Sequence, residues 1–204
     1  MGKKDNTEAE YKILEAARKV FIKKGYAGAR MREIADEAGI NKGLLHYYFK
    51  TKDGLFESIF DELLMTFAPQ LNIIFESDLP FFEKIEQFIN QYMTVLINNP
   101  DLPSFIVHEM QQNEEKVVNA ILKSKHKPNP MKFMMQIQME VATGKIRAIN
   151  PVHLMINMVS LCAFPFVGKP MFKGMLHIND VEYLQIMEIR KKEIVDFIIN
   201  SLKI

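Results

Sequence analysis

The sequence predicts an all-α protein. Apolar residues recur at the three- and four-residue spacing of a helix face in almost every long segment, and proline and glycine separate these segments. No segment shows the alternation of a strand. The expected architecture is an N-terminal three-helix bundle, residues 1–52, followed by a C-terminal helical bundle, residues 53–204.

The first long helix is expected from about Thr7 to Lys24. Its apolar face carries Ile13, Ala17 and Phe21, and Gly25 ends it.

Two short helices follow. The first begins near Arg30 and ends at Gly39, and Asn41 is a good N-cap for the second, which runs through Phe49. Two short helices joined by a tight glycine turn are typical of a helix-turn-helix.

The remaining helices are apolar-rich and separated by proline or glycine. They are expected at residues 53–68, 81–98, 103–112, 114–124, 130–143, 151–167 and 180–202.

The composition is that of an ordinary globular protein, with 48% hydrophobic and 25% charged residues. The single cysteine, Cys162, cannot form an internal disulfide, which favours the cytoplasm. The first ten residues are too polar for the apolar core of a signal peptide. Residues 148–168 lack charge, but their Asn, Pro and His side chains favour a buried helix over a membrane span.

The charge is distributed unevenly. Residues 1–54 hold 12 Lys or Arg against 8 Asp or Glu. A basic N-terminal segment favours a nucleic-acid partner, although a charged, solvated helix face is the commoner explanation of such charge.

Residues 39–52 read GINKGLLHYYFKTK. In the second helix of a helix-turn-helix, early residues face the major groove. There Lys42 is expected to reach a guanine edge or a phosphate, and Gly43 permits close approach of the backbone. His46 is expected to donate to a phosphate or a base edge, and the Tyr47 hydroxyl to a phosphate. Lys52, at the next helix N-terminus, is expected to bind a phosphate.

With Gly25 and the Ile34-Ala35 pair, this motif resembles the DNA-binding domain of the TetR/AcrR family of bacterial transcription regulators. The resemblance covers about the first 55 residues. Leu44 and His46 stand where the family usually has Thr and Tyr. Arg30 replaces a capping hydroxyl and is expected to contact phosphate instead. The expected DNA-binding residues are therefore Arg30, Lys42, Gly43, Leu44, His46, Tyr47 and Lys52.

The resemblance implies a homodimer that binds a palindromic double-stranded DNA operator, usually as a repressor. The helix expected at 180–202 carries an apolar stripe along one face. This stripe and the helix at 151–167 would supply a four-helix interface between two subunits. The alternative is that this stripe packs within its own subunit. The expected interface residues are Leu154, Met158, Leu161, Ile194, Val195, Ile198, Ile199 and Leu202.

Fourteen methionines suggest an adaptable cavity for a small apolar or amphipathic effector, although a methionine-packed core is equally consistent. The expected pocket residues are Phe105, His108, Glu109, Gln112, Met135 and Met139. His108, Glu109 and Gln112 can equally be solvent-facing or a satisfied helix pair.

No catalytic, cofactor or metal-ligand motif is present in the sequence. The expected function is a ligand-responsive DNA-binding regulator and not an enzyme. Two alternatives remain: a DNA-binding regulator without a small-molecule effector, and a helical binding protein that has lost DNA binding.

Overall fold

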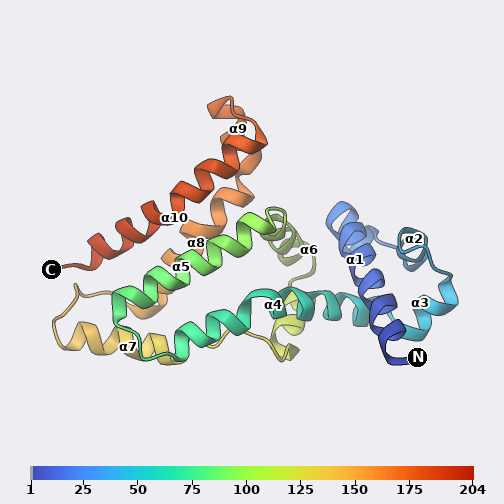
Figure 1. The fold of residues 1–204 in the computed structure, drawn as a ribbon, viewed down its shortest axis with the longest axis horizontal. Coiled ribbons are helices and arrows are strands. Elements are labelled where there is room, and N and C mark those ends of the chain that lie inside the picture. Colours follow the sequence, from blue (N-terminus) through green and yellow to red (C-terminus); the bar gives the residue numbers. More distant parts are fainter. Residues whose placement is uncertain (1) are drawn as a thin grey trace. The chain divides into compact units, whose positions relative to one another are not determined.

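The computed structural model describes residues 2–204, with side chains from Glu8 onward. Within this part of the chain all regular structure is helical, which confirms the all-α class (Figure 1). The helices are α1 (Gly2–Gly28), α2 (Met31–Glu37), α3 (Lys42–Tyr48), α4 (Lys52–Glu76), α5 (Phe81–Asn98), α6 (Leu102–Lys123), α7 (Met131–Ala142), α8 (Pro151–Val167), α9 (Lys169–Leu176) and α10 (Asp180–Leu202).

The chain forms two compact units. Unit 1 contains the residues up to Met65 together with Phe105–Lys127, and unit 2 contains Thr66–Ser104 together with Pro128–Ile204. Most of α6 therefore belongs to the same unit as the three N-terminal helices. This division describes packing, and the functional boundary at residue 52 stays a prediction.

Aromatic side chains hold unit 1 together. The Phe56 ring lies 5.5 Å from that of Phe21 and 5.1 Å from that of Tyr26, between ring centroids. The Phe60 ring lies 5.8 Å from that of Phe105, which adds α6 to the same core. Edge and tilted contacts of this kind are the favoured arrangements of aromatic pairs.

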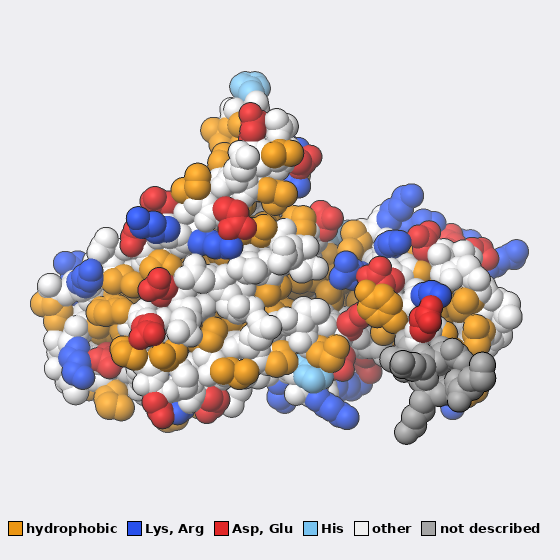
Figure 2. All heavy atoms as spheres, in the orientation of Figure 1, with side chains coloured by type: hydrophobic (Ala, Val, Ile, Leu, Met, Phe, Trp, Pro, Cys, Tyr) orange, Lys and Arg blue, Asp and Glu red, His pale blue; other side chains and the backbone are white. Residues whose placement is uncertain are grey.

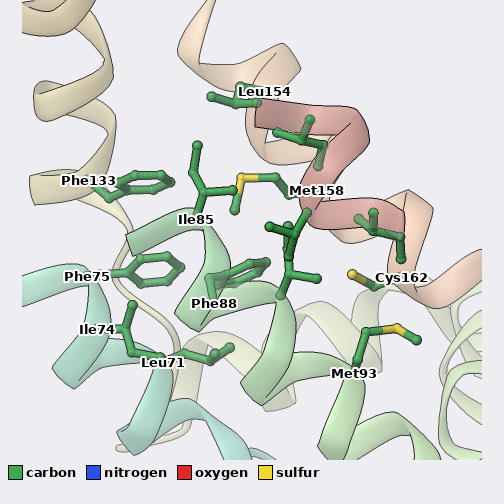
Figure 3. Packing of buried hydrophobic residues seen from close by; sticks show 14 of the residues in the cluster. Leu71, Ile74, Phe75, Ile85, Phe88, Met93, Phe133, Leu154, Met158 and Cys162 are labelled. Atoms are coloured by element: carbon green, nitrogen blue, oxygen red, sulfur yellow. The ribbon is translucent and has the colours of Figure 1, made fainter. Parts of the chain in front are cut away.

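A single apolar cluster forms the core of unit 2 (Figure 3). Helix α5 packs against α7, α8 and α10. Phe133 of α7 stacks on Phe75 at 5.7 Å, and Met158 and Cys162 of α8 are fully buried in the cluster. The methionine-packed core predicted as an alternative is thus present in part, since Met93, Met158 and Met187 are buried.

Most helix boundaries follow the sequence pattern. The structure confirms the predicted helices at 81–98, 151–167 and 180–202. The predicted break at 113 appears as a kink inside α6, where Asn113 has φ −144° and ψ 47°.

One predicted helix end was wrong, and one helix was missed. Helix α4 continues beyond Pro69 to Glu76, because Leu71, Ile74 and Phe75 are buried in unit 2. Helix α9 was not predicted, although a proline in the first turn of a helix is well tolerated.

Across residues 2–204, no single helix combines the length and hydropathy that a membrane span requires.

Candidate nucleic-acid interface

Helix α3 is held at its start by the turn that precedes it. Gly39 has φ +66°, the left-handed conformation that glycine adopts without strain, and the Ile40 N–H donates to the Ala35 carbonyl at 3.0 Å. The Asn41 side-chain oxygen accepts from the Leu44 N–H at 2.8 Å. This confirms the predicted N-cap, and it fixes the first turn of α3 relative to α2.

One face of α3 is buried and the other is exposed. Leu45 is fully buried and Phe49 is 7% exposed, so these two side chains anchor the helix in unit 1. On the opposite face Tyr47 is 74% exposed and Leu44 is 37% exposed. The exposed predicted contact residues of α3 are Lys42, Gly43, Leu44, His46 and Tyr47.

Arg30 occupies the N-cap position of α2 with extended backbone, φ −118° and ψ 138°. Its side chain makes no capping hydrogen bond and is exposed. The guanidinium is therefore not committed to capping the helix.

Lys52 lies at the start of α4, as predicted, and it also makes contacts that were not predicted. Its ammonium donates to the backbone carbonyls of Tyr26 at 2.7 Å and Ala29 at 3.0 Å, and it lies 4.2 Å from the centre of the Tyr26 ring. These bonds tie the start of α4 to the end of α1. Lys52 thus has a structural role that sequence reasoning missed, and its half-buried ammonium is already bonded to protein carbonyls.

A polar cluster joins α6 to the same region of unit 1. The Tyr26 hydroxyl donates to Asp53, and Lys116 of α6 forms an ion pair with that carboxylate. Lys116, and to a lesser degree Tyr26, hold the pKa of Asp53 below its ordinary value. In turn, Asp53 raises the pKa of Lys116.

Glu109 completes this junction. Its carboxylate is fully buried and accepts from the Tyr26 backbone N–H at 2.9 Å and from the Asn113 amide at 3.0 Å. Tyr26, Asp53 and Lys116 were not predicted as site residues. The one sequence signal near Tyr26 is Gly25, which directly precedes it and ends the predicted first helix.

The predicted effector-pocket residues are divided between the two units. In unit 1, Phe105 and Glu109 are buried structural side chains, while His108 and Gln112 are exposed. In unit 2, Met135 and Met139 are 54% and 62% exposed on the surface of α7, so they do not enclose a cavity. Of the alternatives to a pocket, a satisfied pair within one helix describes Glu109, which accepts from Asn113 of α6. Exposure to solvent describes His108 and Gln112.

The expectation of an exposed apolar stripe on the last helix was wrong. The predicted interface residues are buried or half-buried within the core of their own subunit, because α5 and α8 pack against that face of α10. These residues are Leu154, Met158, Leu161, Ile194, Val195, Ile198, Ile199 and Leu202. The same helices carry exposed apolar side chains elsewhere on their surfaces, including Ile156 of α8 and Phe197 of α10.

Among the described side chains, no group of three or more His, Cys, Asp or Glu residues is placed to hold a metal ion.

Comparison with known proteins identifies the domain that contains α3. Residues 13–59 match the family described as bacterial regulatory proteins, tetR family. These residues include α2 and α3 with their capped turn. Residues 13–59 therefore form a DNA-binding domain of the tetR type. Within this domain, α2 and α3 are the helix-turn-helix.

The curated proteins that this chain resembles are regulators. The uncharacterized HTH-type transcriptional regulator YhgD of Bacillus subtilis is 31% identical over 123 residues, which cover 55% of this chain and 64% of that protein. The fatty acid metabolism regulator protein of the same organism is 26% identical over 114 residues, which cover 54% of this chain and 59% of that protein. The chain thus matches less than two thirds of the length of these two relatives.

A solved structure shares the fold over most of the chain. The fatty acid degradation regulator FadR from Bacillus halodurans shares it with a TM-score of 0.65 and 16% identity, over 92% of this chain and 94% of that one.

Proposed function

We propose that this chain is a ligand-responsive transcriptional regulator of the TetR family, a repressor that binds a palindromic operator as a homodimer. The observation that carries the proposal is the exposed face of α3. Lys42, His46 and Tyr47 are exposed there, while Leu45 fixes the opposite face in the core. A rigid helix that presents a cation and two hydrogen-bonding side chains is suited to the major groove.

Operator binding is tested first on the DNA immediately upstream of the chain's own gene, across a salt series. We expect a specific, salt-sensitive complex with two subunits per site. Replacing Lys42 by Ala should weaken operator binding about tenfold or more and reduce the salt slope by about one. Lys125→Ala is the matched control, because it removes one exposed lysine from the same unit, outside α3.

The exposed apolar surface of unit 2 supports the homodimer. Side chains on the surface of α8 and α10 remain in contact with solvent although their neighbours are buried. They are Val152, Ile156, Val159, Ile189 and Phe197, which are between 38% and 67% exposed. Figure 2 shows hydrophobic side chains at the surface of the segment formed by α9 and the start of α10. A two-fold dimer uses one surface patch twice, so this face is our proposed interface in place of the buried stripe.

The interface is tested by placing a charge on it. We expect Phe197→Lys to shift the chain from dimer to monomer in sedimentation equilibrium. Met135→Lys is the control, since Met135 is 54% exposed on α7. A Phe197→Lys chain that stayed dimeric would exclude this face.

An apolar cleft in unit 2 supports an amphipathic effector. The cleft has a volume of about 410 Å³, within the range of ligand sites, and is lined by Phe164, Phe172, Tyr183 and Arg190 among others. The Arg190 Nε is buried without a hydrogen-bond partner, and its Nη2 donates to the Leu161 carbonyl at 3.3 Å. A ligand with an apolar chain and an acidic head group suits this combination.

The names of two relatives suggest the ligand series to test. One is called a fatty acid metabolism regulator and the other a fatty acid degradation regulator. We expect fatty acids to raise the melting temperature and release the operator, and the matching fatty alcohols to do neither. Arg190→Met should abolish the difference, whereas Lys192→Met, which removes an exposed cation from the same helix, should preserve it.

Two other functions remain distinguishable. If operator binding is specific but a broad ligand series never alters it, the chain is a regulator controlled by a protein partner or by its abundance. If no DNA sequence is preferred, the chain is a helical binding protein that has lost DNA binding.

A further inference from the structure

We infer that Leu44 reads the 5-methyl group of a thymine in the operator, and thereby specifies one base pair in each half-site. The inference rests on the proposed DNA binding and deepens it.

Leu44 is the aliphatic side chain on the exposed face of α3. It is 37% exposed, whereas the neighbouring Leu45 is fully buried. Leu44 lies in the first turn of α3, the part of a recognition helix that contacts base edges.

Its polar backbone donor is already bonded. The Leu44 N–H donates to the Asn41 side chain at 2.8 Å, so it is not available for a phosphate oxygen. A leucine side chain neither donates nor accepts hydrogen bonds. Leu44 therefore contributes to DNA recognition only through apolar contact.

The major groove offers one apolar group on its base edges. Adenine, guanine and cytosine present donors and acceptors there, and thymine alone adds a methyl group. Gly43 has no side chain, which leaves room beside Leu44 for a close approach to the groove. A Cβ at residue 43 would lie 3.2 Å from the Asn41 oxygen that caps the helix, so glycine also preserves the cap.

The test removes the methyl group without altering base pairing. The operator of the full chain is first selected from a random duplex pool. Each thymine of the selected site is then replaced by deoxyuridine in turn. Burial of one methyl group corresponds to about a fourfold change in affinity. We expect that loss at one thymine of each half-site for the wild-type chain.

The variants assign the loss to Leu44. Leu44→Ala should bind the thymine and deoxyuridine operators equally at that position. In a double-mutant cycle, this result assigns the effect of the methyl group to its contact with Leu44. Lys42→Ala should weaken binding to both operators and keep their fourfold ratio. Leu44→Gln, which keeps the side chain long but adds hydrogen-bonding groups, should select adenine at that position in a new selection.

The outcomes separate the inference from the function on which it rests. A selected operator at which no deoxyuridine lowers wild-type affinity, or at which Leu44→Ala shows the same loss, would overturn the role of Leu44 and leave operator binding intact. Failure to select any operator would overturn the proposed function itself.

Discussion

The Glu109 carboxylate accepts a hydrogen bond from the backbone N–H of Tyr26, a residue 83 positions earlier in the chain, at 2.9 Å. The bond lies within unit 1 and joins α6 to the turn at Gly25 (φ 67°, ψ 171°), which interrupts α1 shortly before the helix-turn-helix. Gly25 is adjacent, and a Cβ there would lie 3.0 Å from His108 Nε2 and 3.3 Å from Glu109 Oε1. The turn and α6 therefore fit each other closely, and this fit makes the junction testable.

We predict that Glu109→Ala lowers the free energy of unfolding by about 1–3 kcal/mol. The substitution leaves the Tyr26 N–H and the Asn113 amide without their buried acceptor. Urea titration followed by circular dichroism measures the change. Glu114→Ala, at an exposed position of the same helix, is the control and should change it by less than about 0.5 kcal/mol. Equal effects of the two substitutions would contradict a structural role for Glu109.

Lys84→Met should also destabilise the chain by about 1–3 kcal/mol. Lys84 is 1% exposed, and its ammonium donates to the Ser77 carbonyl at 2.7 Å and the Phe75 carbonyl at 3.3 Å. Methionine keeps the length of the side chain but leaves these carbonyls at the end of α4 without a donor. Lys132→Met is a matched control, because it removes an ammonium that bonds the same end of α4 from a more exposed position. We expect Lys132→Met to lower the free energy of unfolding by less than about 1 kcal/mol. A decrease as large as that of Lys84→Met would refute the role of burial.

The ion pair of Asp53 predicts a pH dependence of stability. The pKa of Asp53 is lowered in the folded chain, chiefly by Lys116, so its stabilising contribution is complete above the ordinary carboxyl pKa of about 3.9. The contribution is lost as the pH falls through the lowered folded value. Asp53→Asn should therefore lower stability near neutral pH, and the difference from wild type should shrink below about pH 4. Because the side chain is 58% exposed, the difference should stay near 0.2–1 kcal/mol. Thermal melts from pH 3 to pH 7 measure it, with the exposed Asp101→Asn as control.

The Cys162 thiol should resist modification in the folded chain. Burial raises its pKa to about 12, so very little of the reactive thiolate forms at pH 8. A chromogenic disulfide reagent should react slowly with the native chain and rapidly in 6 M urea. Rapid reaction without denaturant would show that the core around α8 opens readily.

The sequence by itself determined the all-helical class, three helices of unit 2 with their boundaries, and the helix-turn-helix with its Asn41 cap. These features are local. Helical periodicity, capping side chains and glycine turns act within a few residues, so their signals lie in neighbouring positions.

Only the tertiary structure decided which face of each helix is buried. Ile198 and Met135 are both apolar residues on helical stripes, yet the first is 2% exposed and the second 54%. The phosphate contact expected for Lys52 stays a prediction, and only the folded structure showed that its ammonium bonds the carbonyls of Tyr26 and Ala29. Periodicity shows that a helix has an apolar face, but the partner of that face comes from segments far along the chain. Burial and hydrogen-bond partners therefore depend on packing between distant segments, as the 83-residue separation of Glu109 and Tyr26 illustrates.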